Sequence, residues 1–223
     1  MIPLLKDPYY FFILLSVVNI LFYLLTLLFS SYWGCSNKQQ LKKKSLFDFA
    51  LSLFILFVNI AVAIPGYALF YWDIIKFDYT FSFGSLFADL FLLLVVVDFI
   101  MYVAHLSAHR IDFLKKVHER HHTHHEFNEL SLYVLHPFEA IGLGLLFTFL
   151  FCLYDFNIYA VVLFLLLNWF WGVIAHLNVA KVSIPKFFSN NLFHAIHHKT
   201  GAYNLGFYTV LWDKLFKTYK VDI

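Results

Sequence analysis

Residues 81–109 read FSFGSLFADLFLLLVVVDFIMYVAHLSAH, an apolar stretch that ends in two histidines four residues apart. The part from 81 to 104 is long enough for a helix that crosses a lipid bilayer, which needs about 20 mostly apolar residues. His105 and His109 follow directly, and residues four apart lie on one face of a helix. This stretch therefore predicts a membrane helix that carries a pair of imidazoles to the membrane edge.

Further apolar stretches lie on both sides of this one. Residues 9–33 and 46–72 are each long enough for one span, and residues 138–176 are long enough for two. A break near Asp155 and Asn157 would turn the last stretch into a hairpin, with His136 and His176 on the same side. The first half of this hairpin is short, so it either crosses the membrane or only dips into it.

The composition agrees with a membrane location. The 223 residues are 61% hydrophobic and 13% charged, and the mean hydropathy is +0.73. Ordinary soluble domains are about 45–50% apolar and about 25% charged. The expected fold is an all-α integral membrane protein, with about four to five transmembrane or hairpin helices and a cytosolic histidine-rich helical cap. Residues 1–8 lack the basic region of a cleaved signal, so the first apolar stretch is expected to remain as a span.

Lysine and arginine favour cytosolic loops. If residues 36–45, 105–137 and 177–223 face the cytosol, fourteen Lys and Arg residues lie there, and only Lys6 and Lys76 lie on the other side. This bias predicts a multi-pass protein whose histidines face the cytosol. The net charge of +2 singles out no partner, and no feature supports nucleic acid binding.

Histidine is the informative residue type, because all twelve copies lie between His105 and His198. The pattern His-x-x-His-His occurs twice, and each triplet is expected to point its imidazoles in one direction. One metal ion takes about four to six ligands, so nine imidazoles suit two ions. Imidazole binds iron, zinc, copper and nickel, so the ligand type leaves the metal open. The candidate metal ligands are His105, His109, His118, His121, His122, His176, His194, His197 and His198.

Other polar residues lie near these candidate ligands in the sequence. His124 and His125 follow a complete triplet in a polar stretch and are expected to be solvated. His136 is a ligand, an orienting residue or a helix start. Asp98 lies within an apolar span, seven residues before His105, and intramembrane carboxylates tend to be functional. We expect Asp98 to accept the second N–H of a ligand histidine; the alternative is a hydrogen bond to Tyr102 or to another span.

In their order along the chain, these motifs resemble the fatty acid hydroxylase/sterol desaturase superfamily, over about residues 98–218. The similar segments are Asp98-x-x-x-Tyr102-x-x-His105-x-x-x-His109, His118-x-x-His121-His122 with Phe127-Asn128 and His136-Pro137-x-Glu139, His176-x-Asn178 with His194-x-x-His197-His198, Asn204-Leu205-Gly206, and Trp212-Asp213-x-Leu215-Phe216-x-Thr218. Two residues depart from the usual pattern. Lys217 stands where glycine is usual, and Leu106 stands where arginine is common.

The resemblance implies a non-haem di-iron oxidoreductase of the monooxygenase type. Such an enzyme uses O2 and electrons to hydroxylate or desaturate a lipid, such as a sterol or a fatty acyl chain, in lipid biosynthesis. It implies that the nine histidines bind two iron ions, with Asp98 and His136 in orienting roles. No flavin or nucleotide motif is visible, so a separate reductase or electron carrier is expected.

The resemblance also suggests a division of the chain. Residues 1–80 would hold N-terminal transmembrane segments, and residues 81–223 the catalytic region, in one structural unit. The membrane would be a bacterial inner membrane or the endoplasmic reticulum. The alternative is a non-catalytic membrane protein that binds or handles metal. Against it, all histidines lie on one predicted side, and no span carries a ladder of polar ligands.

Overall fold

A computed structural model describes residues 2–36, 45–124, 127–179 and 182–220. These residues form ten α-helices and one 3-10 turn, with two isolated β-bridges and no strand among them. The all-helical fold is therefore confirmed. Several residues used in the predictions above lie outside the described residues: Lys38, Lys42, Lys43, Lys44, Lys181 and His125.

Four helical segments are long and apolar enough to cross a membrane: α2 (Pro8–Ser36), α3 with α4 (Leu46–Ala61 and Ala63–Tyr71), α5 (Phe83–Arg110) and α8 (Ile158–Ala175). α7 (Pro137–Leu153) is a shorter apolar helix. In lipid, main-chain N–H and C=O groups can pair only with each other, which favours long uninterrupted helices. Large apolar side chains such as Leu28, Phe57 and Phe91 are exposed on the outer faces, as expected for contact with lipid.

The second predicted span is interrupted at Val62, where α3 ends and α4 begins. Pro65 follows three residues later, within the first turn of α4. Its ring removes one main-chain donor and clashes with the carbonyl four residues earlier, at Ala61. The interruption is therefore a local effect of proline within one candidate span.

The predicted hairpin is present, and its turn lies between Leu153 and Ile158. Asn157 begins α8, because its side-chain oxygen accepts the N–H groups of Tyr159 and Ala160. Its own N–H donates to the buried carboxylate of Asp89 on α5, at 2.6 Å. The turn is thus attached to α5 at one end of the helices.

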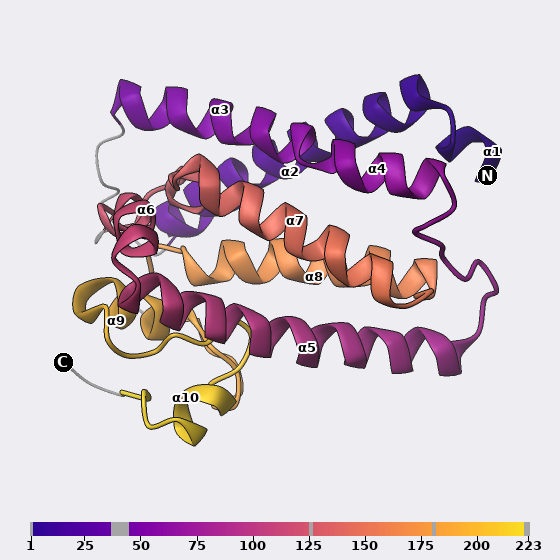
Figure 1. Cartoon of the computed structure of the whole chain (residues 1–223). Helices are drawn as coiled ribbons and strands as arrows, with labels where there is room; N and C mark the ends of the chain where they lie inside the picture. The colour runs from indigo at the N-terminus through magenta and orange to yellow at the C-terminus, as the bar shows by residue number, and fades with distance from the viewer. Residues whose placement is uncertain (1, 37–44, 125–126, 180–181, 221–223) are drawn as a thin grey trace.

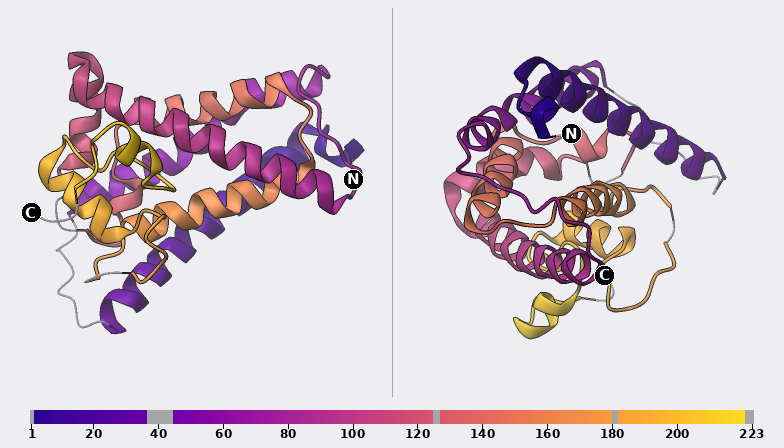
Figure 2. Two further views of the ribbon diagram at one scale, coloured as in Figure 1. Left: turned by 90° about the horizontal axis from the view of Figure 1, so that it is seen from below. Right: turned by 90° about the vertical axis from the view of Figure 1, so that its right-hand side faces the viewer.

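The long helices pack around apolar side chains from α5, α7 and α8. Leu93 and Val97 of α5 meet Ala160 and Phe164 of α8, and all four are buried. At one end of this bundle lie the short helices α6 (Asp112–His122), α9 (Asn191–Thr200) and α10 (Leu211–Leu215) (Figure 1). α1 (Ile2–Leu5) lies at the opposite end, and the view from below in the left panel of Figure 2 shows the same separation.

The start of α7 and the end of α8 meet the short helices at the same end (Figure 1). His136 and His176 therefore lie at one end of the bundle, as predicted. The 3-10 turn η1 (Ser131–Tyr133) connects α6 to α7 there. The bundle thus brings every segment that carries a described histidine to one end.

Candidate metal centre

The nine predicted ligands form two groups of converging side chains. The first, the five-histidine group, consists of His105, His109, His118, His122 and His197. The second, the four-histidine group, consists of His121, His176, His194 and His198. Within each group, one ring nitrogen of every histidine lies within 4.8 Å of the others.

The spacing of these nitrogens matches what a bound metal ion requires. Neighbouring Nε2 atoms lie 3.0–3.3 Å apart in both groups. A metal–imidazole bond is about 2.0–2.1 Å long, so two nitrogens on one ion lie about 3.0–3.4 Å apart. In the four-histidine group each Nε2 contacts two others, and the contacts close a ring around one point. The donor set therefore fits one metal ion in each group.

The prediction that each His-x-x-His-His triplet points its imidazoles in one direction is wrong. The first and last histidines of a triplet are four residues apart and enter the same group: His118 with His122, and His194 with His198. The middle histidines, His121 and His197, enter the other group. Neighbouring residues of a helix are rotated by about 100°, so two adjacent imidazoles cannot reach the same point. Each triplet therefore contributes to both groups.

The two groups lie next to each other. The ring of His122 stacks on that of His198, with centroids 4.6 Å apart and an angle of 22° between the rings. Phe127, which is 4% exposed, packs against the four-histidine group, with its centroid 5.0 Å from that of His198. This geometry suits a centre with two adjacent ions, one side of which an aromatic ring shields from water.

Hydrogen bonds at the opposite ring nitrogen set the direction of several ligand candidates. The Nδ1 atoms of His105, His176 and His197 donate to the carbonyl oxygens of Leu205, Gly172 and Tyr203, each at 2.8 Å. A carbonyl oxygen only accepts, so the proton of these neutral imidazoles lies on Nδ1. Their Nε2 atoms therefore carry lone pairs toward the centre of each group. Lone pairs at such short distances repel unless a cation lies between them, which supports metal binding.

Glu139 is a functional candidate that sequence reasoning missed. Its Oε1 accepts the Nδ1–H of His118 at 2.6 Å, and its Oε2 accepts the main-chain N–H of His136 at 3.1 Å. A carboxylate bonded to a ligand histidine fixes the orientation of the ring and raises its basicity. The capping-box position of Glu139 was the sequence signal that could have revealed it. This motif turns the glutamate side chain back to the N-terminus of its helix, here beside His136 at the start of α7.

Burial keeps the ligand candidates that lie beyond the spans in their neutral form. Loss of hydration lowers the pKa of His121, His194 and His197 well below the ordinary value, and neighbouring imidazoles lower it further. The pKa of His176 falls to about 4, mainly through burial. Metal ions bind neutral imidazole, so these side chains are in the binding form at neutral pH.

Asp98 is buried, but the expectation that it accepts the N–H of a ligand histidine is wrong. The nearby imidazole of His105 donates to Leu205 instead. Residues 204–218, here called the closing segment, bind the carboxylate instead. Four donors reach it: the N–H groups of Tyr208 and Thr209, the Thr209 hydroxyl and the Trp212 indole. These partners lie 110 or more residues away in sequence, so the local helix pattern could not reveal them. Asp98 holds this segment against α5.

Two further histidines of the described residues lie outside both groups. His136 caps α7, because its Nδ1 accepts the N–H of Phe138 at 3.2 Å. The expectation that His124 is solvated is wrong, since the residue is 3% exposed. Its Nδ1 hydrogen-bonds the hydroxyl of Ser131, and its Nε2 lies 3.3 Å from a carboxylate oxygen of Asp48. His124 therefore links α3 to the turn before α7.

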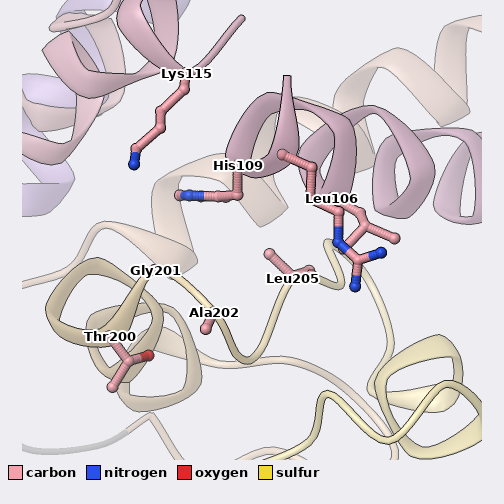
Figure 3. Close-up of a pocket in the computed structure, with 8 residues that line it drawn as sticks. Leu106, His109, Lys115, Thr200, Gly201, Ala202 and Leu205 are labelled. Atoms are coloured by element: carbon pink, nitrogen blue, oxygen red, sulfur yellow. The ribbon is translucent and has the colours of Figure 1, made fainter. Parts of the chain in front are cut away.

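A cavity of about 360 Å³ opens beside the five-histidine group. His109 lies between Lys115 on one side and residues 200–202 on the other (Figure 3). Arg110 also lines the cavity, and no carboxylate does so among the residues described. Among the described residues, His109 is the ligand candidate that lines this cavity.

Comparisons with known proteins agree with the histidine motifs. Residues 90–218, more than half of the chain, match the family described as fatty acid hydroxylase. A relative from Arabidopsis thaliana, named "Putative Delta(7)-sterol-C5(6)-desaturase 2", is 28% identical over 136 residues, which cover 59% of this chain and 48% of the relative. The chain thus spans about half the length of this curated relative. No solved structure matches the chain. The match to the family includes all nine histidines of the two groups, and the chain belongs to the fatty acid hydroxylase family.

Proposed function

We propose that this protein is a membrane-bound non-haem di-iron oxidoreductase that hydroxylates or desaturates a lipid, such as a sterol or a fatty acyl chain. The observation that carries the proposal is the convergence of nine imidazoles into two adjacent groups at one end of the membrane helices. Family membership and the sterol desaturase relative support an oxidoreductase that acts on lipids. Residues 81–223 would form the catalytic region, with residues 1–80 as further membrane segments.

Two iron ions would bind to the five- and four-histidine groups and would supply the activation of O2 that an unactivated C–H bond requires. Hydroxylation uses one O2, two electrons and two protons, and yields an alcohol and one water. Desaturation uses the same reagents and yields a double bond and two waters. A separate reductase or electron carrier would provide the electrons.

The chain's own residues hold and shield the centre. His105, His176 and His197 keep their protons on Nδ1 and turn Nε2 inward. Phe127 covers the four-histidine group and keeps water from it. Because the groups lie at the helix ends, a substrate chain in the membrane can reach them while its tail stays in lipid.

The proposed location is a bacterial inner membrane or the endoplasmic reticulum, with the histidine groups facing the cytosol. The bias of Lys and Arg toward the histidine-bearing segments supports this orientation. A non-catalytic metal carrier would need a polar pathway through the spans. The two buried span carboxylates, Asp89 and Asp98, instead bind main-chain N–H groups of Asn157 and Tyr208, which weighs against that alternative.

The test is a product search with iron-loaded protein in detergent, supplied with O2, a reductant and a membrane lipid extract. The expected result is an oxygenated or newly unsaturated lipid that depends on O2. The matched control is His197→Ala/His198→Ala, which removes one ligand candidate from each group. Absence of any such product from the iron-loaded protein would refute the proposed activity.

A further inference from the structure

The peptide group between Leu205 and Gly206 lies between a ligand candidate and a buried carboxylate. Its carbonyl oxygen accepts the Nδ1–H of His105 at 2.8 Å. Its N–H, on Gly206, donates to Oδ2 of Asp213 at 2.7 Å. Asp213 is fully buried, with an exposed fraction of 0%. One rigid amide thus joins the carboxylate to the imidazole.

The two hydrogen bonds polarise this amide in the same sense. A carboxylate that accepts the N–H shifts electron density toward the carbonyl oxygen, and hydrogen bonds in such a chain strengthen each other. The carbonyl of Leu205 then accepts the proton of His105 more strongly. A stronger acceptor at Nδ1 raises the basicity of Nε2 and fixes the ring direction, as a carboxylate in direct contact does.

Further contacts hold the Asp213 carboxylate in place. Its Oδ1 accepts the N–H of Leu205 at 2.8 Å and the hydroxyl of Thr218 at 2.7 Å. Because Thr218 uses its only hydroxyl proton there, the hydroxyl of Tyr102 must donate to Thr218, at 3.0 Å. Tyr102 and His105 both lie on α5, so the chain of hydrogen bonds begins and ends on the same helix.

Gly206 allows the carboxylate to approach the peptide. A side-chain carbon at this position would collide with the carbonyl oxygen of Thr209 and with Oδ2 of Asp213. The backbone between Leu205 and Asp213 is thus folded tightly enough that only glycine leaves room for the contact.

We propose that Asp213 is a positioning residue for the five-histidine group and acts on His105 through the Leu205–Gly206 peptide. The inference rests on the metal binding proposed above. The effect is expected in this group, because the Asp213 carboxylate binds Leu205, Gly206 and Thr218, and Leu205 accepts the proton of His105. The five-histidine group has two ligand candidates supported by carboxylates, His118 by Glu139 directly and His105 by Asp213 through the peptide.

The test compares Asp213→Asn with Asp98→Asn. Asp98 is a matched control, because it is also buried and binds the same closing segment, but it does not touch the Leu205–Gly206 peptide. Anaerobic titration with Co2+ reports each group through its absorption spectrum, and competition with a chelator gives each affinity. Asp213→Asn is expected to weaken the five-histidine group about tenfold and to leave the other group unchanged. Asp98→Asn is expected to change neither affinity by more than about twofold.

A double-mutant cycle separates positioning from general stability. In a His105→Ala background, Asp213→Asn is expected to cause no further loss of affinity. An equal loss without His105, or equal weakening of both groups, would overturn the inference. If Asp213→Asn does not fold, Thr218→Val removes one donor to the same carboxylate and is expected to weaken the five-histidine group about threefold; no change would overturn the inference. Failure of the unmodified protein to bind metal would instead refute the proposed function, and this inference with it.

Discussion

Replacing Glu139 with glutamine is expected to weaken metal binding by the five-histidine group about 10–100-fold. This loss corresponds to about 1.4–2.7 kcal/mol. The cause is the 2.6 Å contact between Oε1 of Glu139 and Nδ1 of His118, which orients the His118 ring. In this orientation Nε2 of His118 lies 3.1 Å from the Nε2 atoms of His105 and His122.

The shape of glutamine matches that of glutamate, but its hydrogen bonding does not. Both partners of Glu139 are donors: Nδ1–H of His118 and the main-chain N–H of His136. A carboxylate offers an acceptor oxygen to each. An amide offers one oxygen and one NH2 group, so one donor must face another donor, or His118 must move its proton to Nε2 and point it into the group.

The assay is anaerobic titration with Fe2+ or Co2+ in detergent, with a chelator as competitor. Glu119→Gln is the matched control, since Glu119 is exposed on the same helix as His118 and its charge is equal. His136→Ala removes the side-chain cap of α7 and keeps the Glu139 contact, so it reports the cost of the cap alone. An affinity of Glu139→Gln within about twofold of the unmodified protein would refute the assigned role.

Three further predictions concern stability, measured as thermal unfolding midpoints in detergent. Lys217 has a φ of 60°, a left-handed conformation that favours glycine, so Lys217→Gly is expected to stabilise the protein by about 1 kcal/mol; a lower midpoint would contradict this. In metal-free protein, the pKa of His176 lies at about 4 instead of 6.5, so the unfolded state binds more protons between these values. His176 alone should therefore lower the stability by up to about 3 kcal/mol as the pH drops through this window, and a constant midpoint would count against it. Asn157→Ala removes the cap of α8 and should cost about 1–2 kcal/mol; an unchanged midpoint would show that the cap is unimportant.

The sequence was sufficient for the spans and for the set of converging histidines. Apolar stretches of the required length predict the helices, because lipid imposes both length and composition. The hairpin turn was predicted from Asp155 and Asn157, and Asn157 does cap α8. The departure at Lys217 coincides with a left-handed residue, which explains why glycine is usual there.

The sequence pattern did not predict which histidines belong to which group. Residues three and four apart share a helix face only approximately, and the rotation between His121 and His122 is enough to send them to different groups. The partners of Asp98, and the contact of His105 with Leu205, depend on how residues 204–218 fold back over α5, a long-range contact with no local signature. His124 lies in a polar stretch, but it is buried and contacts Asp48 of α3 as well as the nearby Ser131.

The most direct test of the central claim is the identity and number of metal ions in the purified protein, measured together with His197→Ala/His198→Ala. The two histidines belong to different groups, so the double variant removes one ligand candidate from each. We predict about two irons per chain in the unmodified protein and their loss in the variant. One zinc or no metal, unchanged in the variant, would contradict the proposed di-iron centre.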